Sequence, residues 1–112
     1  MIVEVRTYKI APGRRAEFLD FFRERSIPAL REHGMRVLGP LIDLEDPDAF
    51  VWLRIFPDFE SRERLKRDFY EGASWKTELE GIAMPMLASY QSTLCETAAG
   101  FVDDFSGDGG AA

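Results

Sequence analysis

The sequence contains very little of what disulfides and metal sites require. Among its 112 residues it has one cysteine, Cys95, and one histidine, His33. A single cysteine forms no disulfide within the chain, which favours a reducing compartment, and we expect a cytoplasmic protein. One histidine and one cysteine also cannot build a metal site of familiar ligand spacing unless carboxylates supply the other ligands. We therefore expect neither a metal nor a cofactor.

Positive charge is scarce as well. The chain has 14 Lys and Arg against 20 Asp and Glu, which gives a net charge of −6. Binding to nucleic acid or to an anionic membrane needs an excess of Lys and Arg on one face, so neither partner is expected. No apolar run approaches the roughly 20 residues of a membrane-spanning helix. The first residues lack the basic and apolar pattern of a secretory signal, and none is expected.

Apolar residues are plentiful and are concentrated before the end of the chain. They make up 46% of the sequence and include nine Phe, three Tyr and two Trp, enough for the core of one domain. After about residue 96 the chain turns to Ala, Gly, Asp and Ser. We expect one folded domain over residues 1–96 and a flexible tail over residues 97–112.

The hydrophobic pattern predicts four strands, over residues 2–10, 35–44, 49–56 and 87–96. Pro40 cannot donate to a strand ladder, so the second strand should lie at an edge or carry a bulge. The third strand is almost continuously apolar and should lie in the middle of the sheet. Cys95, near the end of the last strand, is expected to be a small core residue.

Helical spacing of apolar residues follows the first strand and the third strand. The first helix should run from Arg14 to His33, with a kink at Pro28. The second should have Ser61 as its N-cap, and a further short helix should have Ser74 as its N-cap. The arginines of the second helix alternate with acidic residues, which predicts a solvated helix surface at Arg62, Arg64 and Arg67.

The element order β-α-β-β-α-β indicates a ferredoxin-like α+β sandwich. With right-handed crossovers it gives a four-stranded antiparallel sheet with the helices on one face and the first and third strands adjacent in the centre. The other face of so apolar a sheet would not stay exposed in water. We expect a homodimer in which two copies pair these faces around a two-fold axis.

Glu4, Arg6 and Tyr8 alternate along the first strand, so their side chains share one face of the sheet. Because the first and third strands are neighbours, Trp52 and Arg54 can lie beside this row. A pocket with a carboxylate, two guanidinium groups, a phenol and an indole would suit a small aromatic or carboxylate-bearing ligand. We expect Arg6, Trp52, Arg54 and Trp75 to contact such a ligand.

Two interpretations of this row remain open. In a catalytic one, Tyr8 donates a hydrogen bond to a developing oxyanion or enolate, and Glu4 or His33 moves a proton. In a structural one, Glu4 and Arg6 pair across strands at a dimer interface. His33 also has two interpretations, as an axial haem ligand or as a residue that caps the end of its helix.

Several of these residues together resemble the NIPSNAP family of the dimeric α/β-barrel group. The matching features are the Glu-x-Arg-x-Tyr opening at residues 4–8, the turn at 11–13, the Phe18 to Phe22 helix, the Pro28 to Gly34 helix end, the Trp52 strand and the Ser74-Trp75 pair. The resemblance covers about residues 2–96. The acidic, proline-bearing loop at residues 45–48 departs from the glycine and asparagine hairpin of many members.

The resemblance implies a dimeric α/β barrel, in a wider group that includes antibiotic-biosynthesis monooxygenases, small-molecule isomerases and haem-handling proteins. The family itself has no well-established reaction. The sequence therefore predicts a domain that binds a small, partly aromatic molecule between sheet and helices, as a cofactor-independent monooxygenase or isomerase. The alternatives are a non-catalytic binding or assembly module, and a haem-handling protein that uses His33.

Overall fold

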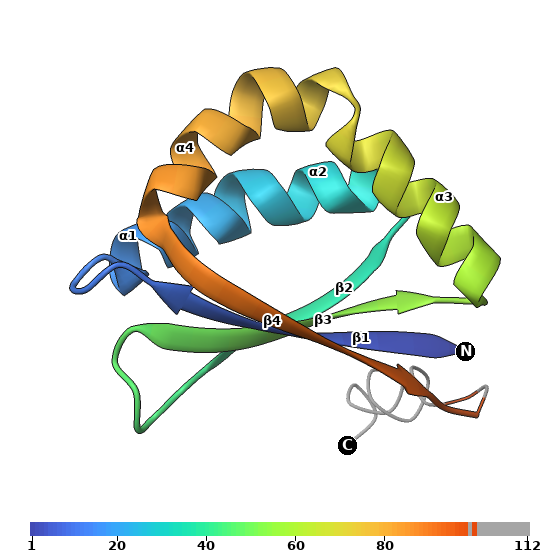
Figure 1. Cartoon of the computed structure of the whole chain (residues 1–112), viewed down its shortest axis with the longest axis horizontal. Coiled ribbons are helices and arrows are strands. Elements are labelled where there is room, and N and C mark those ends of the chain that lie inside the picture. The colour runs from blue at the N-terminus through green and yellow to red at the C-terminus, as the bar shows by residue number, and fades with distance from the viewer. Residues whose placement is uncertain (99, 101–112) are drawn as a thin grey trace, which may run out of the picture.

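A single antiparallel sheet, covered by helices on one face, organises the chain (Figure 1). The computed structural model describes residues 1–98 and residue 100, so most of the predicted tail lies outside the described residues. The strands are β1 (Ile2–Ile10), β2 (Arg36–Ile42), β3 (Ala49–Phe56) and β4 (Leu87–Glu96). Their order in the sheet is β2-β3-β1-β4. The ferredoxin-like α+β prediction is confirmed, including the central pair of first and third strands.

Strand β1 lies between β3 and β4 and is antiparallel to both. Its register pairs Glu4 with Arg54 on β3 and with Leu94 on β4. Further along, Arg6 lies opposite Trp52 on β3. Since successive side chains alternate between faces, this register puts the polar row of β1 and the Trp52 face of β3 on the same side of the sheet. That side is the one that the helices cover.

The edge strand β2 carries the irregularity expected from its proline. Its pairing with β3 shifts register between Leu38 and Leu41, around Gly39 and Pro40. Gly39 has a φ of 111°, and a Cβ atom at this position would lie 3.2 Å from the Cα atom of Trp52. Only glycine combines this backbone conformation with so close an approach. The predicted edge position and bulge are confirmed.

The first helical segment consists of α1 (Arg15–Phe21), a π-helical turn η1 (Phe22–Ser26) and α2 (Ile27–Glu32). Within η1 the N–H of Ile27 donates to the carbonyl of Phe22, five residues back. The wide turn stands directly before Pro28, whose ring leaves no N–H for a regular helical bond. The interruption predicted at Pro28 therefore takes the form of a π turn that ends two residues earlier, at Ser26.

The second helical segment consists of α3 (Phe59–Tyr70), a π-helical turn η2 (Ser74–Leu79) and α4 (Glu80–Met86). Both predicted N-caps are wrong. The carboxylate of Asp58 accepts the N–H of Ser61 at 2.7 Å, so α3 begins earlier and Asp58 is its cap. The position before Ser74 is Ala73, which offers no capping side chain.

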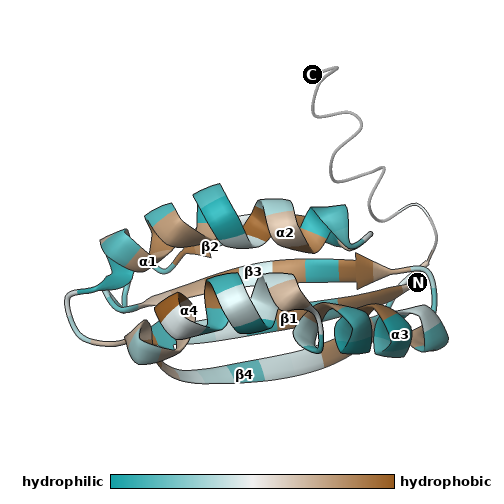
Figure 2. Ribbon diagram, turned by 90° about the horizontal axis from the view of Figure 1, so that it is seen from above, coloured by the Kyte–Doolittle hydropathy of each residue, from teal (hydrophilic) through white to brown (hydrophobic). Residues whose placement is uncertain are grey.

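The main core lies between the helices and the sheet. Figure 2 shows hydrophobic residues along β3 and β1, with more hydrophilic residues on the helices above them. A second, smaller cluster on the face of the sheet opposite the helices joins Val3 and Ile55 to partly buried neighbours, Met1, Val5, Leu38 and Leu53. Cys95 is exposed, so its expected core position is wrong. It lies on the edge strand β4, opposite Val3 and on the face of the sheet away from the helices.

Within the described part of the chain, no helix is both long and apolar enough to cross a bilayer.

Candidate functional site

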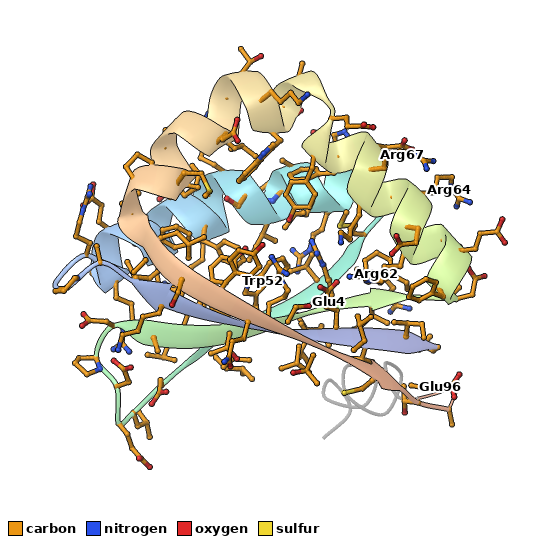
Figure 3. The ribbon with its side chains drawn as sticks, viewed as in Figure 1. Glu4, Trp52, Arg62, Arg64, Arg67 and Glu96 are labelled. Atoms are coloured by element: carbon orange, nitrogen blue, oxygen red, sulfur yellow. The ribbon has the colours of Figure 1, made fainter. Side chains whose placement is uncertain are left out.

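A buried carboxylate at the centre of the sheet gathers three arginines. Glu4 is fully buried, and its Oε1 accepts from Nε of Arg54 at 2.7 Å and from Nε of Arg62 at 3.1 Å. Its Oε2 accepts from Nη1 of Arg6 at 3.3 Å and from the hydroxyl of Ser92. Figure 3 shows Glu4 and Arg62 in the space between sheet and helices, close to Trp52.

These partners fix the charge of Glu4. Burial by itself raises the pKa of the Glu4 carboxyl, but the hydrogen bonds from Arg54 and Arg62 and the charge of Arg54 outweigh it. The pKa of Glu4 consequently lies far below its ordinary value. At neutral pH the side chain is a permanent anion, which suits it to hold arginines in place rather than to exchange a proton.

Arg62 is the residue that the sequence interpretation misplaced. The alternating charges of the helix predict a solvated surface for it, as for Arg64 and Arg67, yet its exposed fraction is 7%. Figure 3 shows Arg64 and Arg67 on the outer side of α3 and Arg62 pointing inward. Helical spacing gives the signal that could have found it, because Arg62, Lys66 and Tyr70 recur every four residues on one face of α3.

Arg6 has fewer partners than the other two arginines. Its single hydrogen bond goes to Glu4, and its Nε is buried with no partner among the described residues. Aromatic rings surround the guanidinium, whose carbon lies 4.7 Å from the ring centre of Tyr90 and 5.6 Å from that of Tyr8. These distances are typical of cation–π contacts, which hold the group in place without using its N–H donors.

Tyr8 supplies a protonated phenol. Its ring packs edge-on against Phe18, Phe50 and Trp52, with ring centres 5.5 to 5.9 Å apart. Burial raises the pKa of Tyr8, and the neighbouring Tyr70 raises it further. The hydroxyl is therefore a hydrogen-bond donor at neutral pH, as stabilisation of an oxyanion requires.

Two hollows adjoin this aromatic group. The inner one, of about 30 Å³, is bordered by Trp52, whose indole N–H is buried without a partner among the described residues. It has room for a water-sized group. The outer one is a cleft of about 300 Å³, at the lower end of the range for small-molecule sites. Its lining includes Arg6, Tyr8, Arg54, Tyr70, Trp75 and Tyr90.

The structure brings together most of the residues that the sequence singled out. Arg6, Tyr8, Arg54 and Trp75 border the cleft, and Trp52 borders the inner hollow. The row of Glu4, Arg6 and Tyr8 lies on the face of the sheet that the helices cover. It therefore does not lie on the opposite face, which is the face expected to pair in a homodimer. Glu4 lies behind the cleft wall. Tyr90, Lys66 and Ser92 were missed; the register of β4 against β1 identifies Tyr90 and Ser92 as neighbours of Tyr8 and Arg6.

His33 lies apart from the other candidates. Its Nδ1 is 3.0 Å from the carbonyl oxygen of Ala29 at the end of α2, and its ring meets Phe69 edge-on at 5.2 Å. It does not border the cleft. These surroundings fit a residue that caps the end of its helix. The interpretation of His33 as an axial haem ligand stays a prediction. Among the described residues no three metal-ligating side chains gather in one place.

The described residues therefore form a ferredoxin-like α+β fold with a polar cleft between sheet and helices. The NIPSNAP family model matches residues 3–99. The chain belongs to the NIPSNAP family, as its residues indicated. No curated protein matches it.

Solved structures extend the likeness in fold. An uncharacterised NIPSNAP domain protein from Burkholderia xenovorans is 23% identical with a TM-score of 0.78, covering 88% of this chain and 96% of that one. A NIPSNAP family protein from Agrobacterium tumefaciens is 18% identical, with a TM-score of 0.77 and coverage of 88% and 93%. A Nitrosomonas europaea protein that carries the provisional name antibiotic biosynthesis monooxygenase is 17% identical, with a TM-score of 0.64 and coverage of 87% and 98%. At these identities the comparison establishes the fold alone.

Proposed function

We propose that this chain binds a small, partly aromatic molecule in the cleft between sheet and helices. The observation that carries the proposal is the cleft itself, in which two arginines and several aromatic rings converge on about 300 Å³ of space. Ligand sites of this kind combine apolar walls with a few fixed polar groups. The alternative, a non-catalytic assembly module, gives no role to the buried donors of Arg6 and Trp52 that have no partner among the described residues.

The reaction we propose is a cofactor-independent monooxygenation or isomerisation. Both would pass through an enolate-like oxyanion, formed when a base takes a proton from the substrate, and the monooxygenation would use dioxygen as its oxidant. The protonated phenol of Tyr8 would stabilise the oxyanion by donating a hydrogen bond. Arg54 and Arg6 would add positive charge nearby, and Glu4 would act as a positioning residue that holds both arginines. The fold shared with proteins named as antibiotic biosynthesis monooxygenases supports this choice.

A thermal-shift screen tests ligand binding. Aromatic acids, their neutral analogues and polyketide-like compounds should include at least one that raises the melting temperature. Binding at one hundred times its Kd stabilises the fold by about 2.7 kcal/mol. For a domain of this size that corresponds to a shift of roughly 10 °C or more.

The variant Trp75→Ala should abolish this shift, because Trp75 borders both hollows. Phe59→Ala is the matched control, since Phe59 is an exposed aromatic residue outside the cleft lining. Each shift is measured against the variant's own melting temperature without ligand. A shift that survives in Trp75→Ala would show that the compound binds elsewhere.

We further propose that the protein is a cytoplasmic homodimer that pairs the sheet faces opposite the helices. The support is the apolar row across this face, in which Leu38, Leu53 and Val5 lie side by side on three neighbouring strands. Pairing of two such rows would remove them from water. The cytoplasmic location rests on the single cysteine, Cys95, which forms no disulfide within the chain.

Leu53→Asp should convert the dimer to a monomer, because it puts a charge at the centre of the paired faces. Light scattering coupled to size-exclusion chromatography measures the mass directly. Leu44→Asp makes the same chemical change at a fully exposed loop position and should leave the dimer intact. A wild-type protein that elutes as a monomer at micromolar concentration would refute the proposal.

A further inference from the structure

We propose that the ligand of the cleft is an organic monoanion, and that its acidic oxygen atoms accept hydrogen bonds from Arg6. This inference rests on the proposed function, because it specifies the charge of the molecule that the cleft binds. It also assigns different roles to three arginines that surround the same carboxylate.

The three arginines around Glu4 differ in how many of their N–H donors form hydrogen bonds. Nε and Nη2 of Arg54 donate to Glu4, and its Nη1 donates to the hydroxyl of Tyr70 at 2.9 Å. Arg62 donates twice to Glu4 and once to Glu63. Arg6 makes one bond of 3.3 Å, although a guanidinium has five N–H donors. The donors left over in this cluster therefore belong mainly to Arg6.

The remaining donors of Arg6 belong to a buried side chain. Arg6 has an exposed fraction of 8% and borders the cleft, and its Nε has no partner among the described residues. A buried donor without an acceptor is unfavourable, and a buried charge without compensation is more so. An acceptor that arrives with the ligand would satisfy both requirements.

The charged side chains around Glu4 do not balance. Three arginines meet two carboxylates, Glu4 inside and Glu63 at the surface, which leaves one positive charge over. On the cleft lining, Lys66 and Glu80 offset one another formally. The surplus of one charge matches a monoanion. It is a local property, because the whole chain has a net charge of −6.

Lys66 supports this picture of a positive cleft. Burial lowers the pKa of Lys66, and the charges of Arg62 and Arg54 lower it further. The part of this lowering that comes from Arg62 and Arg54 reflects the positive charge beside the cleft. An anion in the cleft would reduce that potential.

The rings around Arg6 indicate how the anion would approach. Tyr90 and Tyr8 occupy positions near the guanidinium, and Trp75 borders the same cleft. A carboxylate can bond to a guanidinium in its plane, through two parallel N–H donors. The remainder of the ligand would then lie against the aromatic and aliphatic wall. An aromatic carboxylic acid has this combination of groups.

The test compares an acid with its neutral amide. Binding of 2-naphthoate and 2-naphthamide is measured by isothermal titration calorimetry at neutral pH. Wild-type protein should bind the acid at least about ten-fold more tightly, because hydrogen bonds to charged groups are the strong ones. Arg6→Gln should remove this preference by lowering the affinity for the acid, while the affinity for the amide changes by no more than about two-fold.

Two further variants separate a direct contact from other effects. Arg64→Gln removes the same charge from an exposed position on α3 and should preserve the preference for the acid. Arg6→Lys keeps the charge but loses the planar pair of donors, and should retain part of the preference. It also serves if Arg6→Gln does not fold.

The outcomes distinguish the two proposals. If both probes bind and the amide binds as tightly as the acid, the cleft binds ligands but the monoanion inference is wrong. Equal loss of acid binding in Arg6→Gln and Arg64→Gln would reduce the effect to net charge and overturn the role of Arg6. If neither probe nor any compound of the thermal-shift screen binds, the proposed function fails and this inference fails with it.

Discussion

Glu4→Gln is expected to lower the free energy of unfolding by about 3–5 kcal/mol. The substitution keeps the shape of the side chain but removes the one carboxylate that faces three buried arginines. Their mutual repulsion is then uncompensated in a site from which water is largely excluded. Urea denaturation of the two proteins at pH 7, followed by circular dichroism, measures the difference.

Glu63→Gln is the matched control for this prediction. Glu63 also pairs with Arg62, but its side chain is half exposed, so water screens the pair. We expect a change within about 0.5 kcal/mol. Comparable losses in the two variants would mean that burial of Glu4 has no special consequence.

The same two variants, Glu4→Gln and Glu63→Gln, show how much of the pH dependence of stability comes from Glu4. Because the pKa of Glu4 in the folded state lies far below its ordinary value of 4.5, its contribution to stability is complete above about pH 5. That contribution is lost as the pH falls below this range toward the folded pKa. Wild-type protein and Glu63→Gln should lose stability steeply on acidification, and Glu4→Gln should do so less steeply. Exposed carboxylates such as Asp58, whose pKa is lowered by the Ser61 N–H, maintain the remaining slope.

Phe50→Ala is the second substitution with a large expected effect, a loss of about 3–5 kcal/mol. Phe50 is fully buried on β3, with ring centres of Phe22, Tyr8 and Phe18 at 5.4, 5.5 and 5.8 Å. Truncation leaves a cavity beneath Tyr8, and the packed neighbours cannot all move to fill it. The loss is measured by urea denaturation with an unchanged m-value.

Phe59→Ala makes the same chemical change at a position with an exposed fraction of 53%. The ring of Phe59 lies 5.7 Å from the guanidinium carbon of Arg62, a cation–π contact at the start of α3. We expect a loss of about 1 kcal/mol or less. A loss in Phe50→Ala no larger than this would contradict the packing described for the core.

The architecture could be predicted from the sequence because apolar and polar residues alternate clearly along the strands and because Pro and Gly mark where elements end. The pattern of the last strand predicted its bounds, residues 87–96, and Pro40 indicated the bulged edge strand. Helix starts were harder to predict. Asp58 and Ser61 are both good N-caps, and the choice between them depends on where the chain leaves β3 rather than on local propensity.

The site was predicted only as far as neighbouring strands could place it. Period-two alternation and adjacency of strands brought Arg54 and Trp52 to the polar row. Arg62 and Ser92 reach Glu4 from α3 and β4, across 58 and 88 residues of sequence. Their arrival depends on how far α3 leans over the sheet and on the β1–β4 register. The four-residue spacing on α3 marks the face that carries Arg62, but no short pattern in the sequence gives the lean of the helix or the β1–β4 register.

The position of β1 between β3 and β4 also constrains the order of events during synthesis. The ribosome makes β1 first, yet one of its two edges stays open until the residues of β4 have emerged. Up to that point an apolar strand presents unpaired backbone groups, the kind of edge that recruits other chains. A nascent chain that stalled before residue 87 would therefore be prone to aggregation, and premature termination would be more harmful here than in a protein whose strands pair in the order in which they are made.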